Sequence, residues 1–137
     1  MRLPRLALLL LAAVAAHGCG GKSIPLSIDP AIPAAQGQLK VGTTQNGNTK
    51  LELSIEHLAP PDRISSSASV YVVWVRSHEA EAQPVNLGGL TVNDNLEGEI
   101  VAITPLRNFA LFVTPESSRV VTTPTGKVMI TARIELD

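Results

Sequence analysis

Two segments of the chain alternate apolar and polar residues with a period of two. In "KLELSIEHL", residues Leu51, Leu53, Ile55 and His57 share one face, and glutamates and a serine occupy the other. The segment "KVMITARIELD" near the end of the chain repeats this alternation. The pattern is typical of strands that turn one face to a hydrophobic core and the other to water. We therefore predict two half-buried strands, with His57 at the end of a core-facing stripe.

The other apolar segments extend the strand pattern. "SVYVVWVRS" is apolar on both faces, which predicts a strand in the middle of a sheet with Trp74 in the core. Asn46-Gly47 lies between two strand segments, and both residues tolerate the positive φ of a tight hairpin turn. Further strands are predicted at "GGLTVND", "GEIVAITPL" and "FALFVTPE", which turn signals separate.

Seven or eight short strands without a convincing amphipathic helix indicate an all-β fold. Their spacing of about ten residues favours an antiparallel β-sandwich of immunoglobulin-like type. A small closed β-barrel is the alternative. We assign this β-sandwich domain to residues 39–137.

The first 18 residues have the layout of a secretory signal peptide. Two arginines precede an apolar run from Leu6 to Ala16, and small residues follow it. The run is shorter than the about 20 apolar residues that span a bilayer. We therefore expect the mature chain to be exported.

The only cysteine, Cys19, follows directly after this leader. Ala16, His17 and Gly18 resemble the box that precedes the lipid-bearing cysteine of bacterial lipoproteins, although His17 departs from the usual small residue. We expect lipid attachment at Cys19, since the lipids of such proteins supply a stable anchor. In a host with two membranes, the protein would lie at the periplasmic face or surface of the outer membrane. The alternative is cleavage after Ala16 or Gly18 by the general signal peptidase, which leaves a free thiol.

Residues 19–38 are predicted to form a tether. The segment contains three prolines, which restrict themselves and the residues before them to extended conformations. Its isolated isoleucine and leucine residues leave open a second possibility, that the segment docks on the domain as an edge strand.

Charge excludes one class of partner. Removal of Arg2 and Arg5 with the leader leaves nine Lys and Arg against 12 Asp and Glu, a net charge of −3. A mildly acidic domain has no electrostatic footprint for nucleic acid. We expect no nucleic-acid partner.

From Tyr71 onward, four segments follow in a recognisable order: "YVVWV", "VNLGGLTV", "FALFVTPE" and "PTGKVMITA". In this order and spacing the chain resembles the extracytoplasmic C-terminal domain of anti-sigma-K factors. The resemblance implies a shared outer fold with no catalytic residues. It does not extend to the cytoplasmic sigma-binding domain or the transmembrane helix of that family, so it does not imply sigma-factor binding.

Few residues offer reactive chemistry. "SHEAE" brings His78, Glu79 and Glu81 close in sequence, where they are candidates for a loose divalent-ion site, although a solvated hairpin tip is the simpler interpretation. The chain has no G-x-S-x-G motif and no glycine-rich phosphate loop before a helix. We predict neither a cofactor nor an enzymatic activity.

The aromatic residues are too few for a sugar-stacking platform. The chain has one Trp, one Tyr and two Phe. We assign all four to the structural core: Tyr71, Trp74, Phe109 and Phe112.

These observations predict a non-catalytic cell-envelope lipoprotein whose β-sandwich serves as an interaction or structural module. Its expected partners are the membrane, through the N-terminal lipid, and another envelope protein. The alternative is a periplasmic protein that binds a small molecule or a metal ion.

Overall fold

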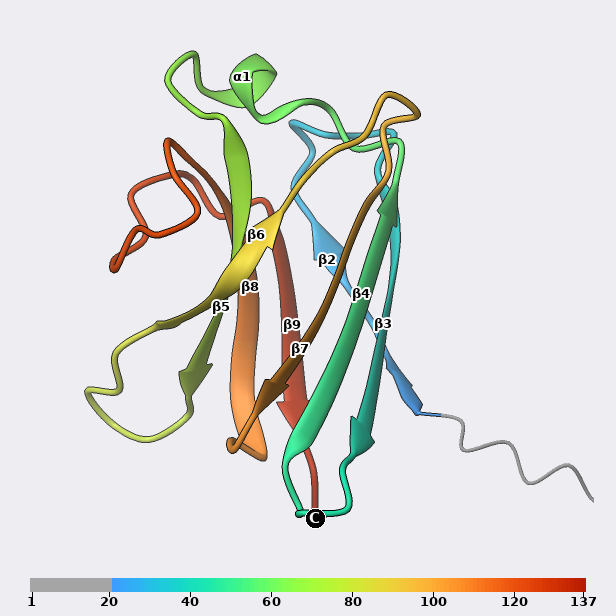
Figure 1. Ribbon diagram of the computed structural model, residues 1–137, viewed down its shortest axis with the longest axis vertical. Helices are drawn as coiled ribbons and strands as arrows, with labels where there is room; N and C mark the ends of the chain where they lie inside the picture. The colour runs from blue at the N-terminus through green and yellow to red at the C-terminus, as the bar shows by residue number, and fades with distance from the viewer. Residues whose placement is uncertain (1–20) are drawn as a thin grey trace, which may run out of the picture.

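The computed structural model describes residues 21–137, which form two antiparallel β-sheets packed against each other (Figure 1). One sheet has the strand order β1-β3-β4-β7, and the other has the order β2-β9-β8-β5-β6. The chain is all-β, as predicted, and over the described residues the sheets do not close into the alternative barrel. The elements are β1 (Lys22–Ile24), β2 (Ser27–Ile28), β3 (Gln36–Thr43), β4 (Thr49–Glu56), α1 (Pro61–Ile64), β5 (Val70–Ser77), β6 (Val85–Leu90), β7 (Gly98–Thr104), β8 (Asn108–Glu116) and β9 (Ile130–Glu135).

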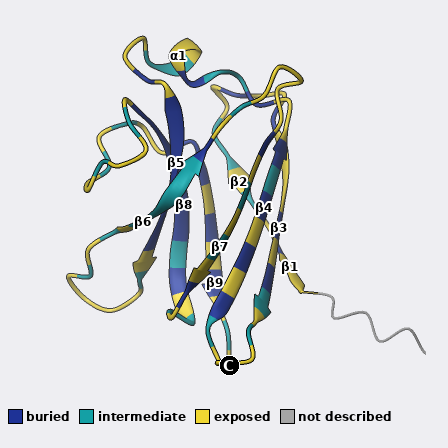
Figure 2. Ribbon diagram, viewed as in Figure 1, coloured by how far each residue is buried: buried dark blue, intermediate teal, exposed yellow. Residues whose placement is uncertain are grey.

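The core lies between the two sheets, and the alternating strands supply it as predicted. In β4 and β9 every second residue is buried, which Figure 2 shows as alternating dark blue and lighter bands. Leu51, Leu53 and Ile55 of β4 are at most 2% exposed. Burial of large aliphatic side chains of this kind contributes about 1.5–3 kcal/mol each to folding.

The hairpin predicted at Asn46-Gly47 is confirmed. Strands β3 and β4 pair from Gln36 with Glu56 to Thr43 with Thr49, and the intervening turn has φ = 80° at Gly47. Positive φ carries no Cβ penalty for glycine. This turn sets the register that turns the apolar residues of both strands inward.

The predicted alternation fails at strand ends. His57 is exposed and has a φ of 54°, because the chain turns away from the sheet after β4 and buries Leu58 in its place. Val128 is 41% exposed, since β9 starts only at Ile130. The imidazole of His57 is therefore not part of the core-facing stripe, contrary to the expectation from the sequence.

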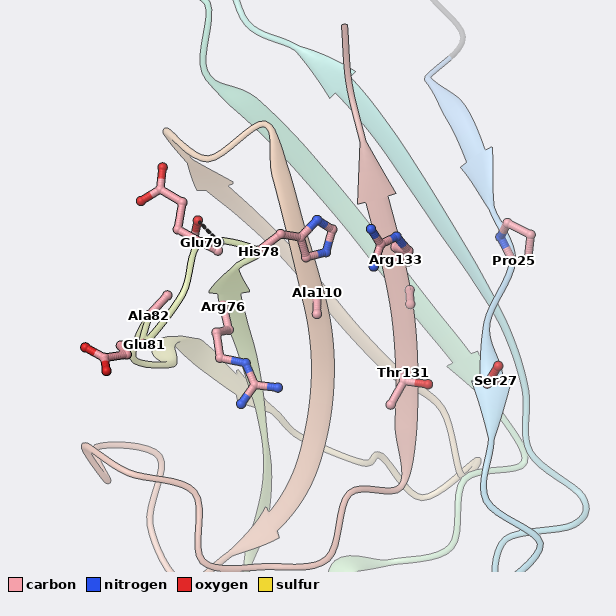
Figure 3. Close-up of a pocket in the computed structure, with 12 residues that line it drawn as sticks. Pro25, Ser27, Arg76, His78, Glu79, Glu81, Ala82, Ala110, Thr131 and Arg133 are labelled. Carbon is pink, nitrogen blue, oxygen red and sulfur yellow. Dashed lines mark hydrogen bonds between the residues drawn. The ribbon is translucent and has the colours of Figure 1, made fainter.

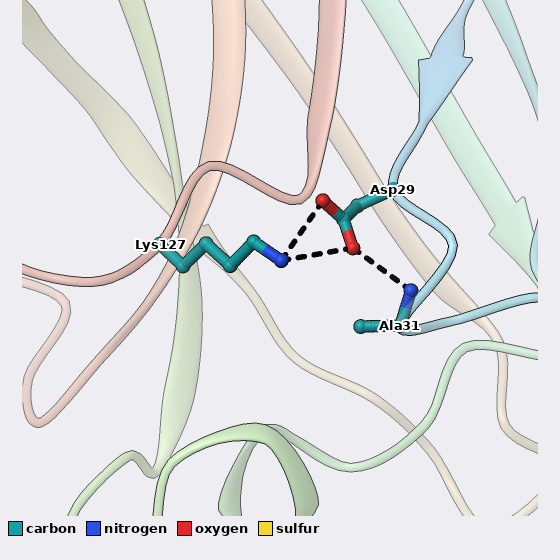
Figure 4. A network of polar contacts seen from close by, with 3 residues as sticks. All are labelled: Asp29, Ala31 and Lys127. Carbon is teal, nitrogen blue, oxygen red and sulfur yellow. Dashed lines mark hydrogen bonds and ion pairs between the residues drawn. The ribbon is translucent and has the colours of Figure 1, made fainter.

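The segment predicted as a tether folds against the domain. β1 pairs with β3, and β2 pairs with β9, so the chain crosses from one sheet to the other between residues 24 and 27. Asp29 forms an ion pair with Lys127 and accepts a hydrogen bond from the amide of Ala31 (Figure 4). The segment therefore docks on the domain through short edge strands, which is the second of the two possibilities. The first strand begins at Lys22, well before residue 39.

From Val70 to Val75, strand β5 is buried on both faces, as its uninterrupted apolar pattern predicted. One face carries Tyr71, which shares the main core with Phe109. The opposite face carries Trp74, which stacks on Phe112 with ring centroids 6.3 Å apart and packs with two valines in a second cluster. Trp74 is thus fully buried on the outer side of the five-stranded sheet, away from the space between the sheets.

A buried carboxylate fixes the segment after β8 that lies over this second cluster. Glu116, at 2% exposure, accepts hydrogen bonds from the hydroxyls of Thr114 and Thr125, each at 2.6 Å. It also accepts the amides of Thr125 at 2.8 Å and Gly126 at 3.1 Å. The Trp74 indole N–H in turn donates to the Thr114 hydroxyl at 2.9 Å. These bonds tie the chain after β8 to the outer face of the sheet.

Gly126 fits this arrangement for a steric reason. A Cβ at this position would collide with the backbone carbonyl oxygen of Pro115. The "PTG" segment therefore combines the threonine that binds Glu116 with a glycine that lets the two backbones approach.

Candidate functional site

Two arginines flank an alanine on the outer face of the five-stranded sheet. Across the three central strands, Arg76 pairs with Ala110, and Ala110 pairs with Arg133. Directly opposed residues of paired strands point to the same face of a sheet. Their inward-pointing neighbours belong to the main core, so these three side chains project outward from the sheet. The methyl group of Ala110 forms the floor between the two longer arginine side chains.

A groove of about 910 Å³ lies over this row. His78, directly after β5, borders it on one side, and Ser27 and Thr131 border it on the other (Figure 3). The hollow exists because the side chain of Ala110 is short and the arginine side chains on both sides of it are much longer. A second hollow of about 310 Å³ shares Arg76, Ala110 and Thr131 with the groove.

The second hollow is more apolar than the groove. Phe112, Pro84, Pro124 and Val128 contribute to its lining. The guanidinium carbon of Arg76 lies 5.7 Å from the centre of the Phe112 ring, within the range of a cation–π contact. Arg76 thus stands at the border between an apolar surface and a polar one.

The two arginines differ in their electrostatic partners. Arg133 pairs with Glu135 on its own strand, with Nη2 2.7 Å and Nε 2.9 Å from Oε1. The three ion pairs within residues 21–137 are Lys50–Glu52, Lys127–Asp29 and Arg133–Glu135. Arg76 takes part in none of them, so its charge has no carboxylate partner in the described part of the chain.

His78, Glu79 and Glu81 all line the groove but do not converge. In Figure 3 the imidazole of His78 extends toward β8, whereas the carboxylates of Glu79 and Glu81 point to the opposite side. Among residues 21–137, no three His, Cys, Asp or Glu side chains gather as metal ligands. The loop that carries these residues is a rim of the groove.

Sequence reasoning missed the arginine pair and its alanine floor. Arg76 follows the apolar run of β5, Arg133 is one of the outward polar residues within β9, and Ala110 is one apolar residue among many. Their proximity depends on β8 lying between β5 and β9, which no local pattern encodes. The single available signal was the strong apolar character of β5 and β8, which marks both as interior strands.

The anchor residues predicted from the sequence lie outside the described residues. These are Cys19 and the preceding Ala16, His17 and Gly18. Within residues 21–137 no helix is long and apolar enough to cross a lipid bilayer.

Comparison of the chain with protein-family models and with curated proteins finds no significant match. The resemblance to the anti-sigma-K C-terminal domain therefore stays a prediction from the sequence. The groove has to be interpreted from its own residues.

Proposed function

We propose that this protein is a non-catalytic, lipid-anchored envelope protein whose β-sandwich binds a partner through the groove over Ala110. The observation that carries the proposal is the groove itself, where Arg76 offers a charge without a carboxylate partner within residues 21–137. Exposed polar and charged side chains on a rigid scaffold are what a recognition surface requires. The leader and Cys19 support the envelope location.

The start of the fold at Lys22 supports an anchored module held close to the membrane. Only two residues lie between Cys19 and Lys22, and the three residue steps from one to the other reach at most about 10 Å. With a lipid on Cys19, the sandwich would lie directly beside the bilayer. An envelope partner would then meet the groove near the membrane surface.

The immunoglobulin-like type is part of the proposal. The order β9-β8-β5-β6 agrees with the G-F-C-C′ order of that fold, and the short β2 adds to it beside β9. The β3–β4 hairpin within the other sheet is a departure from it. We also propose that the sandwich is an outer domain of the anti-sigma-K type, on the basis of the sequence segments that resemble that family.

Photo-crosslinking in cells tests the partner. A photo-reactive amino acid replaces Thr131, which is exposed in the groove, or Lys40, which is exposed on the other sheet and serves as the control. We expect a reproducible protein adduct from position 131 that disappears when Arg76→Gln is added. The same adduct from position 40, or an adduct indifferent to Arg76→Gln, would contradict the proposal.

A diffusible small molecule is the second candidate, and the groove volume favours it. Small-molecule sites usually measure about 300–1,000 Å³, and both hollows fall in this range. No comparable observation favours a metal ion among the described residues.

A further inference from the structure

We propose that the groove binds a small molecule that carries an oxyanion, a carboxylate or a phosphate, on a flat apolar group. The oxyanion lies between Arg76 and Arg133 above Ala110, and the apolar group lies against Phe112. The inference rests on the proposed function in one respect, that the groove is the binding surface. It is independent of the lipid anchor.

The spacing of the arginines suits one oxyanion between them. Adjacent strands lie about 4.8 Å apart, so the Cα atoms of Arg76 and Arg133 are separated by about 10 Å, with the methyl of Ala110 midway. Each guanidinium presents a planar set of N–H donors that matches a carboxylate or phosphate. In the structure the Arg133 guanidinium turns toward Glu135 and that of Arg76 lies over Phe112, so both side chains would swing toward Ala110 to meet a single anion.

The existing ion pair does not occupy this position. Glu135 and Arg133 are both largely exposed, with side-chain exposures of 62% and 69%. An exposed pair of this kind contributes little to stability, so Arg133 can donate to a ligand as well. Arg76 has no ion pair within the described residues that a ligand would have to replace.

The apolar part of the ligand follows from the second hollow. Phe112 lies beneath Arg76, and Pro84 and Val128 border the same space. A flat apolar group placed here removes apolar surface from water while its charge stays beside Arg76. The hydroxyl of Thr131 borders both hollows, so it lies where the charged and apolar parts of such a ligand meet.

The negative charges around the groove are placed so that they oppose an anion only weakly. The carboxylates of Glu79 and Glu81 are exposed and point away from β8 and β9 (Figure 3). In water, charges at the rim of an open groove are strongly screened. Glu135 already balances Arg133, so the local positive charge comes from Arg76, on a domain whose net charge is −3.

Titration of the full-length gene product, purified from the fraction that contains it, tests this chemistry by ¹H–¹⁵N NMR. The probes are benzoate and phenyl phosphate, with phenol as the uncharged control and inorganic phosphate as the control without a ring. We expect both aromatic anions to shift the amides of residues 76, 110 and 133, and both controls to bind at least about 10-fold more weakly. The tighter aromatic anion identifies the preferred oxyanion.

Three variants localise the effect. Arg76→Gln removes the charge, and Ala110→Leu fills the floor between the arginines; each is expected to weaken binding about 10-fold or more. Arg63→Gln removes an exposed arginine from α1, outside the groove, and should leave binding unchanged.

Shifts spread over the whole protein, or equal affinity in Arg76→Gln and wild type, would overturn the inference. The titration uses purified protein and small probes, so it reports on the groove chemistry alone. Failure of the cellular crosslink together with retained probe binding would count against the envelope partner and leave the oxyanion site standing.

Discussion

Replacement of Trp74 by alanine is expected to lower the free energy of unfolding by about 3–5 kcal/mol. Trp74 is fully buried, stacks on Phe112 and donates its indole N–H to Thr114. Its loss leaves a cavity in the small second cluster and removes the donor that orients the Thr114 hydroxyl. Urea denaturation followed by far-ultraviolet circular dichroism measures the change.

Trp74→Phe serves as the matched control, because it keeps an aromatic ring beside Phe112 and removes the indole N–H. We expect it to destabilise the protein by clearly less than the alanine variant. An alanine variant with the stability of the wild type would show that the outer cluster does not support the fold.

Replacement of Glu116 by alanine is expected to cost about 3 kcal/mol, since hydrogen bonds to charged groups contribute about 1.5–3 kcal/mol each and buried donors are costly to leave unpaired. The change removes the shared acceptor of two hydroxyls and two amides. The Thr125 and Gly126 amides would then lose the contact that holds the loop over Trp74. Urea denaturation at neutral pH gives the magnitude.

The same carboxylate predicts a dependence of stability on pH. Burial raises the pKa of Glu116, but hydrogen bonds from Thr114, Thr125 and Gly126 outweigh it and hold the pKa below its usual value of 4.5. A group with a lowered pKa in the folded state stabilises the protein fully above its unfolded pKa, and this contribution is lost as the pH falls through the folded pKa. Wild-type stability should therefore decline below about pH 4.5.

Glu116→Gln is the control for this pH effect, because it has the same shape and does not titrate. The stability difference between the wild type and Glu116→Gln should be largest at neutral pH and shrink in acid. Asp29, whose pKa is also lowered, by the Ala31 amide and by Lys127, remains in both proteins and leaves a common residual slope. A difference that stays constant from pH 7 to pH 3 would show that Glu116 is not the titrating group.

Much of the fold follows from local pattern. Alternation in β4 and β9 identifies half-buried strands, and the two-sided apolar pattern of β5 identifies an interior one. Asn46-Gly47 identifies a hairpin because its backbone requirement is local. In each case the physical cause lies within a few residues of the pattern.

Other features depend on contacts between distant segments. β1 and β2 have three and two residues, too few to show a period, and their pairing with β3 and β9 is what orders them. The outer position of Trp74 depends on a loop that Glu116 ties down. The groove depends on β8 lying between β5 and β9, so its arginines meet only after the whole sheet is assembled.

The intact mass of the protein from the membrane fraction of a bacterial host tests the central claim, a lipid-anchored envelope protein, most directly. The full-length gene is expressed beside its Cys19→Ala variant. We predict a mass equal to residues 19–137 plus a diacylglyceryl group, and loss of this species in the variant. An unmodified soluble product from the wild-type gene would contradict the anchor and move diffusible ligands of the groove to the front.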